Sequence, residues 1–400
     1  MPVFGVGSGG FKGQRGAVLD RLLNVLESAV AAPGSADVAL ILHARADYAA
    51  VQSRRREHFK PSNSVGALSE RVRQSGLVLF IGAGASAGAG FPTWNALLAE
   101  LADQTHLSEE VRRAVLRLPA PDAADVIGSE LGNLQALIAE RFAQDGCALT
   151  HALLASLRVR EAVTTNYDTL YENAAVIPHG KALKVLPRER RSADEPWLLK
   201  LHGDIKLDNS IVLTRDQYLR FDADSVPLAS VVQSSMVTNH MLFIGYSLSD
   251  ENFIRLARQV RHLFRAAGTD GPVGTVLTLF EDPARHRMWQ GDLDFIPMVP
   301  TAPVRSDDTC GEVSPSAIAA AARRLDIFLD QLAAASCDDA PYVLNERYRE
   351  LLSADDQVLA DALQRLREAA GSSGRRADSP AWAKARNLLR ELGWAPDKRG

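Results

Sequence analysis

Short runs of hydrophobic residues mark the strands that the sequence predicts. The clearest is Leu77–Ile81, five apolar residues with no polar alternation, which is typical of a strand buried on both faces. Beyond residue 160 similar runs alternate with polar turns, and we predict strands at 161–165, 183–186, 197–202, 210–213, 241–245, 273–280 and 295–299. Helical segments between several of these runs indicate an α/β fold with a mainly parallel sheet.

Apolar residues at helical spacing predict helices before, within and after this region. After a glycine-rich start, helices are predicted at 17–32, 36–59 and 65–74 and, with breaks at 119–121 and 145–146, at 95–157. We therefore predict three parts. They are a helical N-terminal extension over 1–75, a sheet domain over 76–335 with a helical module at about 95–157, and a helical C-terminal tail over 336–400.

A glycine-rich turn follows the first strand directly. Gly82 and Gly84 are expected to leave room for a ligand, Ala87 stands at the third small position of G-x-G-x-x-G/A, and a helix is predicted at 95–103. Outward-pointing amides and the helix dipole would bind a pyrophosphate without a lysine, and Gly-Lys-Ser and Gly-Lys-Thr do not occur in the sequence. Many α/β domains have such a turn for structural reasons, so this stretch alone leaves ligand binding open.

Polar side chains follow three of the later predicted strands where each ends. In an open parallel sheet, ligands bind at the carboxyl ends of strands, where the glycine turn also lies. All four segments are therefore expected to converge on one crevice. The polar residues are Asn166 and Asp168, His202 and Asp204, and Ser247 and Asp250.

Each of these positions also has a purely structural interpretation. Asn166 and Asp168 could cap the helix that follows them, and His202 could be a turn histidine. Asp250 fits the N-cap of a helix over 251–264. Taken singly, the residues favour these structural interpretations, and only their order along the chain favours a site.

Composition narrows the class of protein. A net charge of −4 and a pI near 6.2 give no general electrostatic reason to expect nucleic acid or acidic membranes as partners. The three cysteines, Cys147, Cys310 and Cys337, cannot assemble a disulfide framework or a four-thiolate zinc site. No apolar run reaches the roughly 18 residues that span a bilayer, and the N-terminus lacks the layout of a signal peptide, so we expect a cytoplasmic protein.

A simple dinucleotide-binding dehydrogenase is a poor match. Its second strand normally follows the first within roughly 30 residues, whereas here a long helical stretch intervenes. The acidic residue that holds the adenosine ribose after the second strand is also missing. We predict instead that the helical stretch is a module beside the cleft.

Four motifs occur in order: GAGAS at 82–86 with Pro92 shortly after, TNYD at 165–168, LHG at 201–203 and GYSLSDENF at 245–253. This set resembles the sirtuin-like NAD-consuming family over about residues 76–335. The chain is similar to the bacterial sirtuin-like NAD hydrolases of antiphage defence and not to the protein deacetylases. The paired-cysteine zinc module is absent, and Pro92-Thr93-Trp94 stands where deacetylases carry Pro-Asp-Phe-Arg. The resemblance implies a Rossmann-like sheet in a sirtuin-like NAD-binding catalytic domain, with NAD as substrate and no metal.

The resemblance also implies hydrolysis of the nicotinamide–ribose bond to give nicotinamide and ADP-ribose. His202, whose ordinary pKa is near 6.5, would accept a proton from a ribose hydroxyl. Asn166 would orient the water or the carboxamide, and Asp168 would support the site or cap a helix. The residues expected to hold NAD are Gly82, Ala83, Gly84, Ala85, Ser86, Pro92, Trp94, Thr165, Gly203, Gly245, Tyr246, Ser247 and Asp250.

Other functions and the partners stay open. The same cleft could serve a protein deacylase or an ADP-ribosyltransferase, or sense NAD or a nucleotide without cleaving it, although the presence of both Asn166 and His202 argues against a sensor. Apolar stripes in both flanks predict a homo-oligomer with regulated activity, whereas flanks folded back onto the sheet domain would bury the same stripes. For a subset of the family, the resemblance implies a hexameric DNA-translocase-type ATPase as partner. We expect no membrane partner and no direct binding to nucleic acid.

Overall fold

The computed structural model describes residues 13–31, 37–301, 313–371 and 379–394. The chain divides into two compact units, of which one is Asn63–Ala333 and the other combines Met1–Ser62 with Ala334–Gly400. The predicted glycine-rich start at 1–12, Cys310 and the end of the predicted tail at 395–400 lie outside the described residues. In the ranges that are described, no helix is long and apolar enough to cross a membrane.

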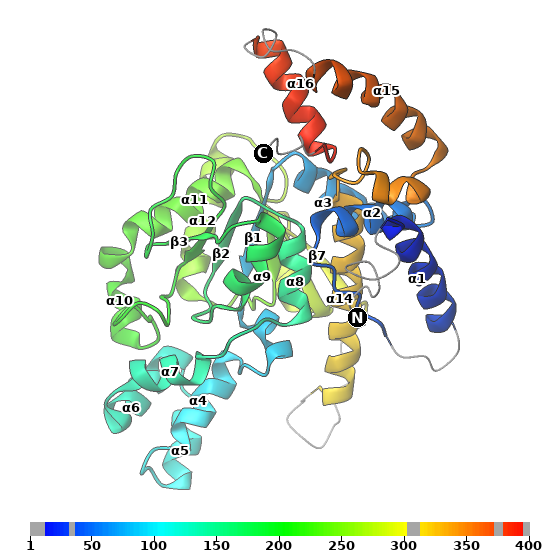
Figure 1. Ribbon diagram of the computed structural model, residues 1–400. Coiled ribbons are helices and arrows are strands. Elements are labelled where there is room, and N and C mark those ends of the chain that lie inside the picture. Colours follow the sequence, from blue (N-terminus) through cyan, green and yellow to red (C-terminus); the bar gives the residue numbers. More distant parts are fainter. Residues whose placement is uncertain (1–12, 32–36, 302–312, 372–378, 395–400) are drawn as a thin grey trace. The chain divides into compact units, whose positions relative to one another are not determined.

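The larger unit is built on a seven-stranded sheet in the order β3-β4-β2-β1-β5-β6-β7. Figure 1 labels β1, β2, β3 and β7 of this sheet among the surrounding helices. Each neighbouring pair of strands is parallel, which confirms the predicted α/β fold. The strands are β1 (Leu77–Ile81), β2 (Glu161–Thr164), β3 (Lys184–Leu186), β4 (Trp197–Lys200), β5 (His240–Ile244), β6 (Gly274–Phe280) and β7 (Leu293–Val299).

The strand order reverses at β1. The chain passes from β1 to β2 and on to β3 and β4 on one side, then returns to β5, which pairs with β1 on the other side. In open parallel sheets the carboxyl ends of strands at such a reversal form the crevice that binds ligands. The loops after β1, β2, β4 and β5 are therefore in the position expected of a site.

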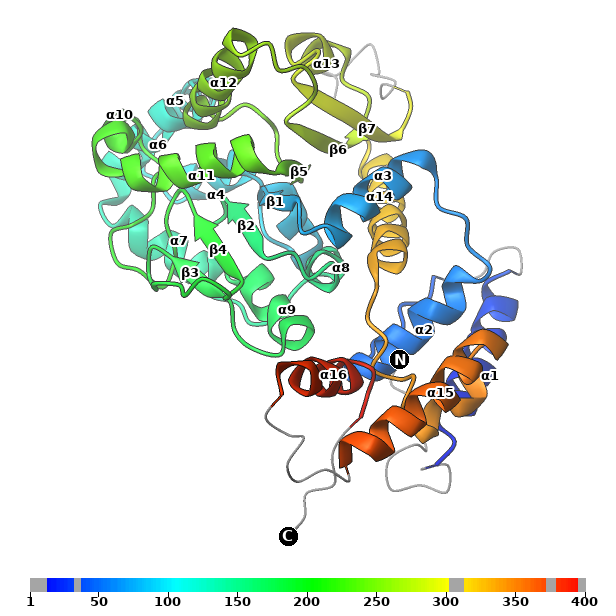
Figure 2. The same cartoon turned by 90° about the horizontal axis from the view of Figure 1, so that it is seen from above.

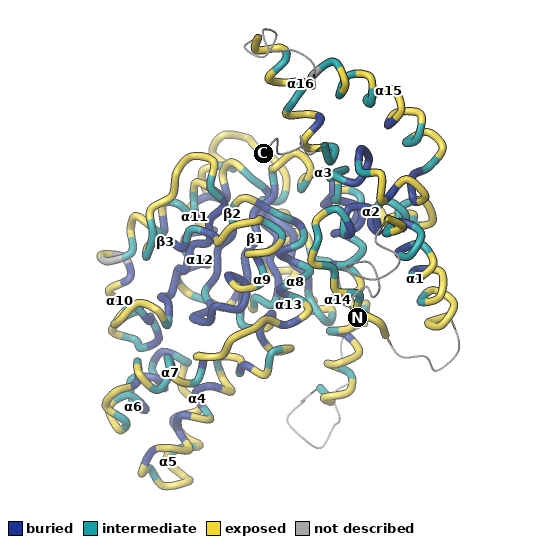
Figure 3. Tube along the Cα trace, viewed as in Figure 1, coloured by how far each residue is buried: buried dark blue, intermediate teal, exposed yellow. Residues whose placement is uncertain are grey.

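Helices cover both faces of the sheet (Figure 2). Alternate residues of β1 face opposite cores, because side chains alternate along a strand. Leu77, Leu79 and Ile81 pack with α3 (Asn63–Arg73), α8 (Leu149–Ser156), α9 (Leu170–His179) and α14 (Pro315–Ser336). Val78 and Phe80 pack with α10 (Arg215–Asp224), α11 (Val226–Thr238) and α12 (Glu251–Ala266), while α13 (Pro283–Met288) connects β6 to β7. All five β1 residues are buried, which explains the absence of polar alternation (Figure 3).

A helical module lies between β1 and β2. It contains η1 (Ala83–Ala89), α4 (Trp94–Ala102), α5 (Glu109–Val115), α6 (Ala120–Leu131) and α7 (Leu134–Phe142). Tyr167, Ile211 and Leu213 contribute to its hydrophobic core, so the module packs on the loops that follow β2 and β4. Pro119 is the N-cap of α6 and Pro121 lies in its first turn, where proline has no helical hydrogen bond to lose. The break predicted at 119–121 therefore lies earlier, between the end of α5 at Val115 and the start of α6 at Ala120.

The strand predicted at 210–213 is wrong. Its backbone groups bond to a turn and to side chains instead of a neighbouring strand: Val212 donates to the carbonyl of His202 at 2.8 Å, and the carbonyl of Ile211 accepts from the Gln135 amide at 2.9 Å. Ile211 and Leu213 are apolar because they fill the core of the helical module. Apolar residues at alternate positions thus arise here without a sheet.

The smaller unit combines both ends of the chain. Its helices are α1 (Arg15–Val30), α2 (Arg45–Arg56), η2 (Glu346–Leu351), α15 (Ala354–Gly371) and α16 (Pro380–Glu391), which share one hydrophobic core. Asp47 on α2 is buried and accepts hydrogen bonds from Arg15 and, at 2.7 Å, from the Tyr348 hydroxyl. Because the helices of both flanks share this core, part of each predicted apolar stripe is buried inside the smaller unit. The exposed remainder includes Val25, Val358, Leu359 and Leu388.

Candidate active site

The turn after β1 packs against the turn after β5. The amides of Gly82 and Gly84 donate to the carbonyls of Ile244 and Gly245, each at 2.9 Å, and the amide of Ala85 donates to Gly82 at 3.0 Å. The prediction that the amides of this turn point outward to a pyrophosphate is wrong for these three residues. Backbone carbonyls already accept hydrogen bonds from these three amides, so the amides are not free to bind a ligand.

The glycines of the two turns permit this close approach. A Cβ on Gly82 would lie 2.5 Å from the carbonyl oxygen of Gly245, and one on Gly84 would lie 2.9 Å from Gly245 Cα. Gly245 has a φ of +63°, and its own Cβ would lie 2.2 Å from the amide nitrogen of Ala85. The space that Gly82 and Gly84 leave is therefore filled by protein backbone and not, as predicted, kept for a ligand.

Asn166, two residues after the end of β2, belongs to a buried hydrogen-bond network. Its Nδ2 donates to the carbonyl of Gly82 and to Ser86 Oγ, both at 3.1 Å. The Ser86 hydroxyl donates to Asp168 Oδ2 at 2.8 Å, and Asp168 Oδ1 accepts from the amide of Leu170 at 3.0 Å. Both hydrogens of the Asn166 amide are thus used, and its Oδ1 is buried without a partner among the described residues.

His151 on α8 completes this network and was missed by the sequence analysis. Its side chain is fully buried, and its Nδ1 accepts from the amide of Ala148 at 3.3 Å. In the neutral ring Nε2 then carries the hydrogen, which faces Ser86 Oγ at 3.4 Å. Burial lowers the pKa of His151, and the charge of Asp168 raises it by less. The net shift is downward, so the neutral ring is favoured. No motif marks this histidine, because its partner lies 65 residues earlier in the chain.

His202, in the turn after β4, is buried against aromatic rings. Its ring centroid lies 5.6 Å from that of Tyr218 and 6.4 Å from that of Trp94. His202 Nε2 is 3.4 Å from Asp250 Oδ2. Burial lowers the pKa of His202 and outweighs the Asp250 charge, so the imidazole is a neutral base at neutral pH.

Asp250 combines its structural interpretation with a place beside His202. Its Oδ1 accepts from the amide of Phe253 at 2.8 Å and caps α12. Its Oδ2 accepts from the Tyr218 hydroxyl at 2.8 Å. Tyr218, on α10, was not among the predicted site residues, and it fixes the carboxylate that faces the histidine.

Four buried polar atoms near these loops have no hydrogen-bond partner among the described residues. They are Asn166 Oδ1, His202 Nε2, Trp94 Nε1 and Tyr246 Oη. Unpartnered buried polar atoms are uncommon in folded proteins. The set includes acceptors and donors, so it suits a ligand with hydroxyl and amide groups. All four atoms belong to predicted site residues.

The other predicted residues lie on the same loops and differ in exposure. Gly203 has a φ of +99°, and its Cβ would lie 2.2 Å from the carbonyl oxygen of Ser210, so this turn requires glycine. Ser247 is exposed, and its hydroxyl lies 2.6 Å from that of Ser249. The half-buried members are Ala83, Pro92 and Thr165.

A buried ion cluster beside the site was also missed. The Lys200 ammonium lies 2.7 Å from Glu172 Oε1 and 3.1 Å from Asp204 Oδ1. Arg188 pairs with the second oxygen of each carboxylate, at 2.9 Å for Glu172. Two buried or half-buried cations therefore pair with two buried anions between α9 and the loops after β3 and β4, and the exposed Lys206 lies 3.9 Å from Glu172 Oε2.

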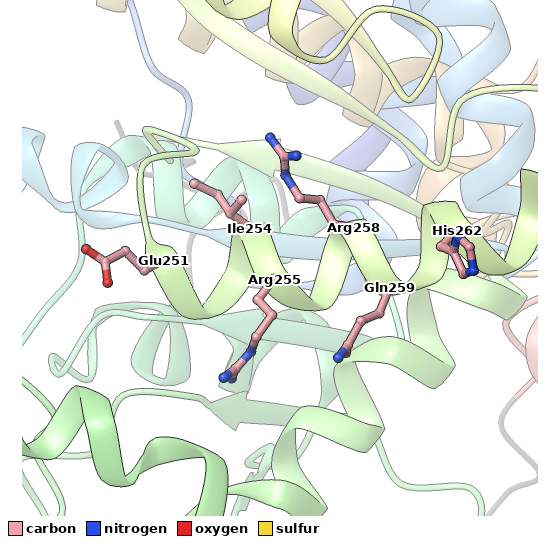
Figure 4. Close-up of a pocket in the computed structure, with 6 residues that line it drawn as sticks. All are labelled: Glu251, Ile254, Arg255, Arg258, Gln259 and His262. Carbon is pink, nitrogen blue, oxygen red and sulfur yellow. The ribbon is translucent and has the colours of Figure 1, made fainter.

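Two further features lie outside this network. Within the described ranges, no group of three or more potential metal ligands occurs. A shallow depression on the surface of α12 is lined by side chains of that helix alone, and none of them is a predicted site residue (Figure 4). They are Glu251, Ile254, Arg255, Arg258, Gln259 and His262.

Comparisons with known proteins identify relatives of this sheet domain. Residues 160–292 match the family described as SIR2-like domain. The chain is 29% identical over 203 residues to NAD(+) hydrolase ThsA of Enterococcus faecium, a match that covers 49% of this chain and 42% of that protein. It is 27% identical over 209 residues to Defense-associated sirtuin 2 of Bacillus subtilis, covering 49% of this chain and 20% of that protein. A solved Sir2 homologue mutant in complex with ADP-ribose matches at 15% identity and a TM-score of 0.31, covering 65% of this chain and 98% of that one.

The parallel sheet and the match of residues 160–292 make this α/β protein similar to proteins with a SIR2-like domain. The predicted resemblance to the sirtuin-like NAD hydrolases of antiphage defence is confirmed by the SIR2-like match and by the names of the relatives. The chain matches less than half the length of these relatives.

Proposed function

We propose that this protein hydrolyses NAD to nicotinamide and ADP-ribose and acts in antiphage defence by depleting NAD. The observation that carries the proposal is a pair of buried atoms, Asn166 Oδ1 and His202 Nε2, that make no hydrogen bond to any described residue. They lie on the loops after the neighbouring strands β2 and β4. Relatives named NAD(+) hydrolase ThsA, at 25–29% identity over about half of this chain, support the same reaction.

The reaction breaks the bond between ribose C1′ and the nicotinamide nitrogen, and a water molecule adds to C1′ with loss of one proton. The nicotinamide ring of NAD is cationic, so it leaves as a neutral molecule and no acid has to protonate it. The protein must therefore stabilise an oxocarbenium-like transition state and place the water.

The buried side chains suit these two tasks. Neutral His202 would accept a proton from a ribose hydroxyl, which increases the electron density at the reacting sugar. Asn166 Oδ1 would accept a hydrogen bond from the water or from the carboxamide. Ser86, held by Asp168 and His151, fixes the orientation of the Asn166 amide so that Oδ1 is the free atom.

The remaining predicted residues would surround NAD in this proposal. Because the amides of Gly82, Gly84 and Ala85 are occupied, the turn after β1 would bound the site by its shape. Trp94 Nε1 and Tyr246 Oη are the further polar atoms available to the ligand. The proposal also includes assembly into a homo-oligomer, which mass measurements test. It further includes activation by a partner such as a hexameric ATPase, which activity measurements test.

Product analysis tests the proposed reaction. The purified full chain is incubated with NAD, alone and with candidate partners, and the products are separated by chromatography. Equal amounts of nicotinamide and ADP-ribose are expected. Formation of acyl-ADP-ribose from an acetylated peptide, or of ADP-ribosylated protein, would instead indicate a deacylase or a transferase. NAD that binds but remains intact under all conditions would indicate a sensing module.

A further inference from the structure

We propose that Lys200 is a positioning residue that holds the loop bearing Asn166 and the loop bearing His202 in a fixed relative arrangement. The proposal rests on the proposed function for its catalytic consequence. It rests on geometry alone for the link between the two loops.

Lys200 is the last residue of β4, and its side chain is fully buried. A buried ammonium is costly unless its donors are satisfied and its charge is balanced. Its three N–H groups match three hydrogen bonds, to the carbonyls of Tyr167 at 3.1 Å and Asp168 at 2.7 Å and to Asp204 Oδ1 at 3.1 Å. Glu172 lies at 2.7 Å as an additional counter-ion.

These partners flank the proposed catalytic residues. Tyr167 and Asp168 are the two residues after Asn166, while Lys200 and Asp204 stand two residues before and two after His202. Two of the three bonds go to main-chain carbonyls, so they fix the path of the backbone after Asn166 directly. One ammonium group therefore joins both loops.

The link begins where the sheet ends. The ladder between β2 and β4 stops at the pair of Thr164 and Lys200, followed by one further bond from the amide of Leu201 to Thr164 at 2.8 Å. The strands themselves are thus aligned by backbone bonds and do not need the ammonium. Beyond this point one backbone bond joins the two loops, from the amide of Ile205 to the carbonyl of Tyr167 at 3.2 Å. Lys200 adds three bonds from a single buried group, two of them to the carbonyls of Tyr167 and Asp168.

Arg188 closes the cluster from its outer side. It pairs with Asp204 and Glu172 but makes none of the bonds that Lys200 makes to the carbonyls after Asn166. Arg188 therefore offers a matched control, since it shares the counter-ions of Lys200 and lacks its link to the loop after β2.

Two double variants separate positioning from charge balance. Lys200→Met/Glu172→Gln and Arg188→Met/Glu172→Gln each remove one cation and one anion, which avoids an uncompensated buried charge. We expect both to fold. Displacement of a catalytic group by a fraction of an ångström to an ångström lowers turnover strongly, so kcat for NAD should fall at least about 10-fold in the first variant with KM little changed. The second variant should stay within about threefold of the parent, because the bonds that set the geometry are kept.

Amide hydrogen exchange of the same ligand-free proteins gives a readout that does not depend on NAD. Exchange at 165–170 and 202–206 should rise in Lys200→Met/Glu172→Gln and not in Arg188→Met/Glu172→Gln. Equal losses of kcat or equal exchange in the two variants would overturn the positioning role, and so would failure of the lysine variant to fold. If the parent chain cleaves no NAD but the exchange difference appears, the loop link stands and the proposed function falls.

Discussion

At the scale of single residues, each proposed catalytic side chain combines structural contacts with one buried atom that makes no hydrogen bond to a described residue. Asn166 donates both amide hydrogens, one to the carbonyl of Gly82 and one to the Ser86 hydroxyl. His202 packs among aromatic rings beside Asp250. Both stand out in the sequence as polar residues at the end of an apolar run, and each lies two residues after the end of its strand. His151 and Lys200 could not be predicted, because their function depends on partners brought together only by the fold.

The buried environment of His202 predicts the pH dependence of NAD cleavage. Burial lowers its pKa below the ordinary 6.5, so the base remains neutral as the pH falls past that value. We expect the acidic limb of kcat/KM to have its midpoint below pH 6.5. The profile is measured with the parent chain and with His240→Gln, which alters another buried histidine, bonded to Thr275 at the start of β5. A midpoint above pH 6.5 in the parent, or a shift caused by His240→Gln, would contradict the assignment.

At the scale of elements, local pattern predicts a strand when all its determinants lie within the strand. Leu77–Ile81 was predictable because both of its faces are buried. Residues 210–213 were misassigned because apolar positions do not reveal whether a partner strand exists. The contact between the turns after β1 and β5 was missed for a related reason, since Gly82 and Gly245 are far apart in sequence.

That contact predicts a large effect of a small substitution. Gly245→Ala combines a left-handed φ with a collision at the Ala85 amide, whereas Gly268→Ala, at φ +66°, meets no atom within 4 Å. The left-handed conformation alone costs about 1–2 kcal/mol for an alanine. Gly245→Ala should lower the free energy of unfolding by at least about 1 kcal/mol more than Gly268→Ala, because of overpacking. Equal losses in urea unfolding would show that the turns are not tightly packed.

At the scale of the whole molecule, the two flanks form one compact unit, which the sequence analysis did not predict because the stripes that pack together come from opposite ends of the chain. Deleting one flank would expose the core of the other. A surface change is therefore the better probe of assembly.

We expect the full chain to form an oligomer through apolar residues that this unit leaves exposed. Val358, 70% exposed, and Leu359 on α15 are the clearest of these. Val358→Glu/Leu359→Glu should lower the molar mass measured by light scattering at micromolar concentration, because charges disfavour burial in an interface. Leu219→Glu, at a 73% exposed site on α10, is the control and should leave the mass unchanged. A monomeric parent, or an unchanged mass in the double variant, would refute this expectation.

The rate of NAD cleavage by His202→Ala and Asn166→Ala tests the proposed catalytic site most directly. Each variant, shown to be folded by circular dichroism, should cleave NAD at least about 100-fold more slowly than the parent, the usual low end for a positioned acid–base group. His240→Gln and Asn239→Ala, near the opposite ends of the strands, should keep the parent rate. Near-parent cleavage by a folded His202→Ala or Asn166→Ala would remove that residue from the mechanism, and retention by both would contradict the site.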